Sequence, residues 1–169
     1  MNNKVLIYDL NYFDSIISNY DKIVKKILPI IHIPQYSYYL IKSKYDNNQK
    51  ELINKFIQEK YLKIEDIDCD STEYETFIKL KKGINCQCRS KSESIAITLA
   101  KHSDFIVLTK NNDSFKEFDI STITINNLIL NSFNNKSITL EEAEELWTCL
   151  GKCIDNCEYG SFKEFLENS

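Results

Sequence analysis

The chain is poor in glycine and proline, with 3 glycines and 2 prolines among 169 residues. An all-β fold with many loops needs these turn residues at regular intervals, so their shortage argues against it and favours helices and buried strands. The chain also lacks an excess of positive charge, since its formal net charge is −4. This balance gives no support for a typical nucleic-acid binder, although it allows a local basic patch around an acidic metal site.

Long apolar runs are also absent, because no apolar stretch approaches the length that crosses a membrane. The first residues, MNNKVLIYDLNYFDSII, interrupt their apolar run with Asp9, Asn11 and Asp14, and no small-residue cleavage pattern follows. We therefore expect no signal peptide and no membrane segment, and we expect a cytoplasmic protein. In that compartment the six cysteines are thiols rather than disulfides.

Two further kinds of site lack their usual patterns. Cys86 and Cys88 form a CxC, but no CxxC pair occurs, so the spacing of a zinc knuckle is absent. Cys149, Cys153 and Cys157 recur at every fourth residue, which favours buried thiols on one helix face, with a composite thiolate metal site as the alternative. The 2 histidines stand in no serine or cysteine pattern, so there is no case for a catalytic triad.

What the chain does contain is an alternation of apolar strands and amphipathic helices. Strands are predicted at 4–10, 30–34, 62–67, 105–110 and the first half of 121–130, and helices at 11–28, 35–46, 48–62, 71–83, 92–104 and 138–159. Such alternation predicts an α/β fold with a parallel sheet and helices on both faces. No linker or repeat is visible, so we expect one domain over residues 1–169.

Acids and amides fall where the strands of this sheet end. Asp9 ends the first strand, Asn111 and Asp113 follow a later one, and Glu93 stands at the start of the helix before it. In open α/β sheets, ligands gather at the carboxyl ends of strands, so these four side chains are expected to converge. Their oxygens suit a hard cation such as Mg²⁺, which in phosphodiester hydrolysis holds the phosphate and activates water.

Each of these residues also has a purely structural interpretation. Asp9 and Asn11 are good N-caps for the helix that follows, and Ser90 with Glu93 fits a capping box. Asn112 and its neighbours are common turn residues, and for Asn112 the turn interpretation is favoured. Only the joint placement of the acids and amides indicates a metal site.

The order of these pieces resembles the PIN-domain family of metal-dependent nucleases, most closely the compact branch often found as toxins beside an antitoxin. The opening strand of that family ends in D-T-N or D-T-S, and VLIYDLN supplies Asp9 and Asn11. A proline then leads a helix, as Pro34 does in IPQYSYYLIKSK. The family pattern G-E-x-x-A-I-x-L-A matches SESIAITLA, with Ser92 for the glycine and Glu93 for the acid.

The later motifs extend the resemblance to about residues 4–150. FIVLTKN matches a strand that ends in T-x-D, with Thr109 and then Asn111, while TINNLIL and ITLEEAEEL resemble the family's tail before C-terminal helices at 139–168. Two positions depart from the pattern. Tyr39 or Leu40 stands where the second acid is expected, and Asn111 stands where the fourth is expected.

The resemblance implies a single-domain PIN-like three-layer fold and a divalent-metal-dependent ribonuclease, with the toxin of a toxin–antitoxin pair as one form of it. It implies catalytic roles for Asp9, Glu93 and Asp113. These three residues and Asn111 would hold Mg²⁺ or Mn²⁺. The partners it implies are an RNA substrate, an antitoxin or other protein, and a second copy in a homodimer. The alternative, favoured by Tyr39 and Asn111, is a catalytically degenerate module that binds RNA or a protein partner.

Several residues near the predicted site are candidates for substrate binding. They are Asn11, Arg89, Lys91 and Thr109. Arg89 and Lys91 lie just before Glu93 and would hold phosphates, although a solvated helix end is the favoured interpretation of such a cluster. The ten tyrosines, several of them in QYSYYL, would stack bases in one interpretation and pack a core or a partner interface in the other.

Overall fold

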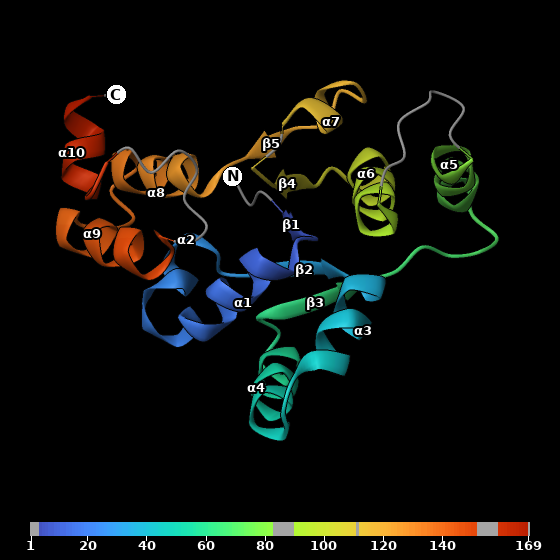
Figure 1. The fold of residues 1–169 in the computed structure, drawn as a ribbon, viewed down its shortest axis with the longest axis horizontal. Coiled ribbons are helices and arrows are strands. Elements are labelled where there is room, and N and C mark those ends of the chain that lie inside the picture. Colours follow the sequence, from blue (N-terminus) through green and yellow to red (C-terminus); the bar gives the residue numbers. More distant parts are fainter. Residues whose placement is uncertain (1–3, 83–89, 111, 152–158, 169) are drawn as a thin grey trace. The chain divides into compact units, whose positions relative to one another are not determined.

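Strands and helices alternate along the chain in a computed structural model that describes residues 4–82, 90–110, 112–151 and 159–168 (Figure 1). The strands are β1 (Val5–Ile7), β2 (Ile31–Pro34), β3 (Leu62–Glu65), β4 (Ile106–Leu108) and β5 (Thr122–Ile123). The helices are α1 (Leu10–Ser18), the π-helix η1 (Tyr20–Val24), α2 (Lys25–Ile27), α3 (Gln35–Lys44), α4 (Asn47–Gln58), α5 (Thr72–Lys81), α6 (Lys91–Ser103), α7 (Asp113–Lys116), α8 (Ile125–Asn134), α9 (Leu140–Cys149) and α10 (Phe162–Glu167).

The five strands form one sheet in the order β3-β2-β1-β4-β5. β1 pairs with β2 and with β4 in parallel, and β2 pairs with β3 in parallel. Leu6 stands at the centre of this ladder, opposite His32 on one side and Val107 on the other. The predicted α/β class, with a central parallel sheet flanked by helices, is confirmed. The PIN-like identity stays a prediction.

The chain divides into two compact units. The sheet unit comprises Met1–Leu10 and Ile30–Thr122, and the helical unit comprises Asn11–Pro29 and Ile123–Ser169. The sheet unit carries strands β1 to β4 and helices α3 to α7, and the helical unit carries η1, α2, α8, α9 and α10. The prediction of a single domain stays a prediction.

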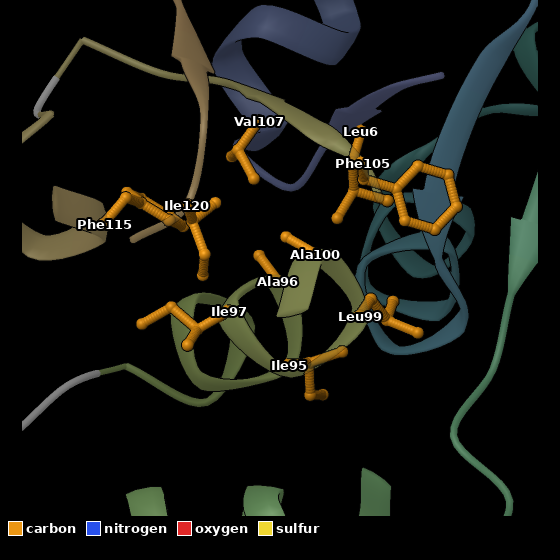
Figure 2. Packing of buried hydrophobic residues seen from close by; sticks show 10 residues of the cluster. All are labelled: Leu6, Ile95, Ala96, Ile97, Leu99, Ala100, Phe105, Val107, Phe115 and Ile120. Atoms are coloured by element: carbon orange, nitrogen blue, oxygen red, sulfur yellow. The ribbon is translucent and has the colours of Figure 1, made fainter. Parts of the chain in front are cut away.

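Helix α6 is the central helix of the sheet unit, and its middle is buried on all sides. It packs against β1, β2 and β4 on one side and against α5 on another (Figure 1). In Figure 2, Ala96 and Ala100 lie on the side of α6 that faces Leu6 and Val107, while Ile95 lies on the opposite side. Small residues against the sheet allow the helix to approach the strands closely, which explains why this stretch is rich in alanine and serine.

The ends of α6 are fixed by local polar contacts. The Ser90 hydroxyl accepts from the Glu93 backbone N–H at 3.1 Å, as the sequence predicts for an N-cap. The buried hydroxyls of Ser94 and Thr98 donate to carbonyls one turn back, at 3.0 and 2.8 Å, so burial leaves neither of them unsatisfied. Asp104, in the left-handed region with φ 53°, ends the helix.

The helical unit has its own aromatic core. The Trp147 ring lies 5.6 Å from that of Phe162 and 5.0 Å from that of Phe165, between ring centroids. The Glu144 carboxylate accepts from the backbone N–H groups of Phe162 and Lys163, at 3.1 and 2.7 Å. These contacts dock α10 on α9 and satisfy the first amides of the short helix.

Two predicted helices differ from the observed ones. The predicted helix 138–159 begins with Thr139 as N-cap but ends at Cys149, because Leu150 and Gly151 leave the helix; Cys153 and Cys157 lie outside the described residues. The predicted helix 11–28 is broken into α1, η1 and α2. None of the helices in the described ranges is long and apolar enough to span a membrane.

Candidate functional site

The sheet reverses its strand order at β1. The chain runs from β1 to β2 on one side and later returns to β4 on the other. At such a switch point the loops after the two neighbouring strands diverge and leave a crevice for ligands at the carboxyl edge. Tyr8 and Asp9 follow β1, and Thr109 follows β4. The topology therefore places the ends of the two motif-bearing strands at the position where α/β proteins bind ligands.

The Tyr8 side chain organises this crevice. Its hydroxyl shares a hydrogen bond of 3.3 Å with the Thr109 hydroxyl, and its ring centroid lies 5.6 Å from that of Phe115. Its backbone carbonyl accepts from the buried Ser37 hydroxyl at 3.2 Å, which ties the end of β1 to helix α3. Thr109 is itself buried, so the phenol is held by residues that have little freedom to move.

The electrostatics of Tyr8 show which acids are near it. Burial raises the pKa of the Tyr8 phenol above its ordinary value of 10.0, and the negative charges of Glu93 and Asp9 raise the pKa further, while the Thr109 hydrogen bond opposes them. The phenol is therefore protonated at neutral pH. The two carboxylates that raise this pKa come from separate segments, Asp9 from the turn after β1 and Glu93 from α6, and we call Tyr8, Asp9, Glu93 and Thr109 the Tyr8 cluster.

The Tyr8 cluster contains two carboxylates that could bind a hard cation. No group of three or more His, Cys, Asp or Glu side chains suited to a metal occurs among the residues that the structure describes. Mg²⁺, however, is commonly held through one or two carboxylates, with waters and substrate phosphates completing its shell. Asp9 and Glu93, both half-buried, supply two carboxylates.

The loop after β4 carries the remaining predicted ligands. Asp113 is the first residue of α7, its side chain is 89% exposed, and its carboxylate lies 3.4 Å from Lys116 Nζ. Asn112 Oδ1 is buried and has no hydrogen-bond partner within the described ranges. Asn111 lies outside the described residues. The Tyr8 hydroxyl is thus hydrogen-bonded to Thr109 and its pKa responds to Asp9 and Glu93, whereas the contact described for Asp113 is with Lys116, and the ligand roles of these residues stay predictions.

The predicted substrate-binding residues are divided among different places. Lys91 begins α6 and lies over the Tyr36 ring, with its Nζ 4.2 Å from the ring centroid. Asn11 is an exposed residue of α1 in the helical unit. Arg89 lies outside the described residues. Tyr39, at the expected position of the second acid, is 58% exposed. The roles assigned to these residues stay predictions.

A second polar pair lies in β2 and β3. His32 is buried, and its Nδ1 lies 2.6 Å from Glu65 Oε1, with its ring 5.0 Å from that of Phe105. Burial lowers the pKa of the imidazole below its ordinary value of 6.5, although contact with Glu65 opposes the shift. The interpretation of His32 as a core histidine rather than a base agrees with this environment.

Sequence reasoning missed Tyr8, at the centre of the cluster, and Ser37, whose hydroxyl donates to the Tyr8 backbone carbonyl. Tyr8 carries a hydroxyl at the point where the apolar run VLI ends, directly before Asp9. That position could have indicated Tyr8 as a site residue. Ser37 gives no such signal, because its role depends on the packing of α3 beside β1. Comparison with protein-family models and with curated proteins finds no match for this chain.

Proposed function

We propose that the chain is a divalent-metal-dependent ribonuclease whose reduced acidic site is the Tyr8 cluster. The observation that supports this best is that Asp9 follows β1 beside the half-buried Tyr8 at the switch point of the sheet, where the charges of Asp9 and Glu93 both raise the pKa of the Tyr8 phenol. Two carboxylates are as many protein ligands as many Mg²⁺ or Mn²⁺ sites use, with waters and substrate phosphates as the other ligands. The RNA substrate and the metal follow from the resemblance to the PIN-domain family.

In this proposal Asp9 and Glu93 hold the cation, with Asn111 and Asp113 as further ligands that the resemblance implies. When bound, the cation would orient the scissile phosphate and activate water for its hydrolysis. Tyr8, protonated at neutral pH, donates a hydrogen bond to a phosphate oxygen or to water, and Thr109 fixes the direction of that bond.

The remaining parts of the proposal rest on the resemblance and the sequence. Arg89, Lys91 and Asn11 contact the RNA backbone, the protein works in the cytoplasm, and a toxin would be held by an antitoxin or would pair with a second copy. A small neighbouring gene that encodes an antitoxin-like protein would support the toxin form directly.

A second candidate function is a degenerate PIN-like module that binds RNA or a protein partner without cleaving RNA. Its support is that Tyr39, which is 58% exposed, stands at an expected acid position, and that Asn111 stands at another. Both candidates keep the fold and differ only in chemistry, so cleavage separates them.

The test is cleavage of a mixed RNA panel by the purified chain, with Mn²⁺ or Mg²⁺ and with a chelator. The variants are Asp9→Asn and Glu93→Gln, and the controls are Asp70→Asn and Glu145→Gln, which change exposed acids elsewhere. The ribonuclease proposal expects cleavage that needs metal, disappears in both site variants and persists in both controls. Equal background in the parent and in the site variants, all folded, supports the non-catalytic module instead.

A further inference from the structure

A pocket of about 310 Å³ opens on the sheet unit beside the carboxyl ends of β2 and β3. Four aromatic side chains line it, from α3 and α5: Tyr36, Tyr39, Tyr74 and Phe77. We call this site the aromatic pocket. Its volume lies at the lower end of the range for small-molecule sites, so it suits one ring-sized group rather than an extended ligand.

The aromatic faces of this pocket are unusually open to solvent. Tyr39 is 58% exposed and Tyr74 is 36% exposed, and these are two of the four large hydrophobic residues that are exposed in the described ranges. Tyr74 pairs with Phe77 at 6.2 Å between ring centroids, which holds the two rings at one wall. Exposed rings that converge on one cavity are the arrangement on which single-stranded nucleic acids stack their bases.

The acidic part of the pocket favours a base over a phosphate. Glu65 and Asp66 line one part of it, and both are acceptors. Glu65 is held by His32, while Asp66 is exposed and its Oδ1 accepts from the Ile67 N–H at 2.9 Å. A phosphate would be repelled by these acids. A base with an exocyclic amine would donate to them, as cytosine and other amine-bearing bases do to Asp or Glu.

Helix α6 connects this pocket to the Tyr8 cluster. Lys91 and Ile95 line the pocket from one face of the helix, four residues apart. Glu93, two residues after Lys91, points to a different face and acts on Tyr8. Lys91 is thus a cation of the pocket lining, with its Nζ over the Tyr36 ring, in the same helical turn as Glu93, where it can contact the phosphate that joins two nucleotides.

We propose that the aromatic pocket holds an unpaired adenine or cytosine of a single-stranded RNA whose backbone passes Lys91 toward the Tyr8 cluster. The inference deepens the proposed function, on which it rests for the identity of the ligand. The rings of Tyr39 and Tyr74 stack on the base, and Asp66 accepts from its exocyclic amine. A base without such an amine, uracil, would bind more weakly.

The test is the binding of labelled oligo(A), oligo(C) and oligo(U) to the full chain, by fluorescence anisotropy in chelator, so that no cleavage intervenes. Tyr39→Ala and Tyr74→Ala should each weaken oligo(A) binding by about 5- to 150-fold, the range for loss of one stacked base. Tyr39→Phe keeps the ring and should bind like the parent. Leu140→Ala removes an exposed apolar side chain elsewhere and should have no effect.

A base-specific readout tests the polar contact separately. Asp66→Ala removes the acceptor and should reduce the preference for oligo(A) over oligo(U) several-fold, without weakening oligo(U) binding. Absence of oligonucleotide binding, or equal binding by the parent and both alanine variants, overturns the inference and assigns the pocket to a protein partner. Metal-dependent cleavage that survives Tyr39→Ala unchanged would overturn only the proposal that the aromatic pocket binds a base of the substrate. RNA binding without any cleavage would overturn only the proposal that the chain is a ribonuclease.

Discussion

The Tyr8 cluster and the aromatic pocket lie at the same carboxyl edge of one sheet but differ in chemistry. The cluster combines carboxylates and hydroxyls between β1 and β4, whereas the pocket combines exposed rings with a lysine beside β2 and β3. Carboxylate oxygens suit a hard cation, which in turn can hold a phosphate, and open rings suit a base. The difference suggests that one edge separates cleavage from recognition, with α6 as the element that serves both.

The largest expected effect comes from the carboxylates of the cluster. Glu93→Gln should lower the rate of metal-dependent RNA cleavage by about 100-fold or more, because a bound cation supplies several kcal/mol of transition-state stabilisation. Asp113→Asn should cost about tenfold at most, since that side chain is 89% exposed. Single-turnover cleavage with saturating enzyme measures both. Equal losses in the two variants would place Asp113 in the site.

A truncated core side chain on α6 should lower the free energy of unfolding, because this helix carries residues of both the Tyr8 cluster and the aromatic pocket. Leu99 is 2% exposed in the core, so Leu99→Ala should lower the free energy of unfolding by about 2–5 kcal/mol. Leu80 of α5 is only partly buried, and Leu80→Ala should cost less than about 2 kcal/mol. Urea unfolding measures both values. A larger loss of unfolding free energy in Leu80→Ala than in Leu99→Ala would contradict the claim that α6 is the central helix of the sheet unit.

Acidification is expected to weaken the side of the sheet that carries the pocket. The folded-state pKa of His32 is below its ordinary value of 6.5, so the unfolded chain binds this proton more readily than the folded chain does. The corresponding stability is present above about pH 6.5 and is lost as pH falls toward the folded-state pKa. Thermal unfolding of the parent and of His32→Gln from pH 7.5 to 5 measures the difference.

In that series the unfolding temperature of the parent should fall more steeply than that of His32→Gln. His102→Gln, which changes an exposed histidine, is the matched control. Parallel curves for the parent and His32→Gln would show that the imidazole of His32 does not contribute to the pH dependence.

The smallest expected effect is at the start of α6. Ser90→Ala removes the hydroxyl that accepts from the Glu93 N–H, and it should lower the free energy of unfolding by about 1 kcal/mol. The same turn carries Lys91 and Glu93, so RNA binding and cleavage should weaken together and by similar small factors. Thr139→Ala, at the N-cap of α9, should cost similar stability without changing RNA binding.

The sequence predicted most of the elements of the fold because their patterns are local. Buried strands and capped helices depend on neighbouring residues, and the N-caps at Ser90 and Thr139 form as expected. The predicted helix 138–159 differs from the observed one because α9 ends at Cys149, with Leu150 as its C-cap, although the apolar period of the sequence continues beyond that point. Asp9 and Glu93 were predicted as candidates. Tyr8 and the aromatic pocket depend on contacts between distant segments, which no local pattern encodes.

The most direct test of the central claim is a Mn²⁺ titration at pH 7, followed by the electron paramagnetic resonance signal of the free ion. The account predicts one site in the parent chain that weakens by at least tenfold in Asp9→Asn and in Glu93→Gln. Tyr39→Ala should bind the ion like the parent, since the aromatic pocket takes no part in it. Equal Mn²⁺ binding by the parent and both carboxylate variants would contradict the claim that these two acids hold a cation together.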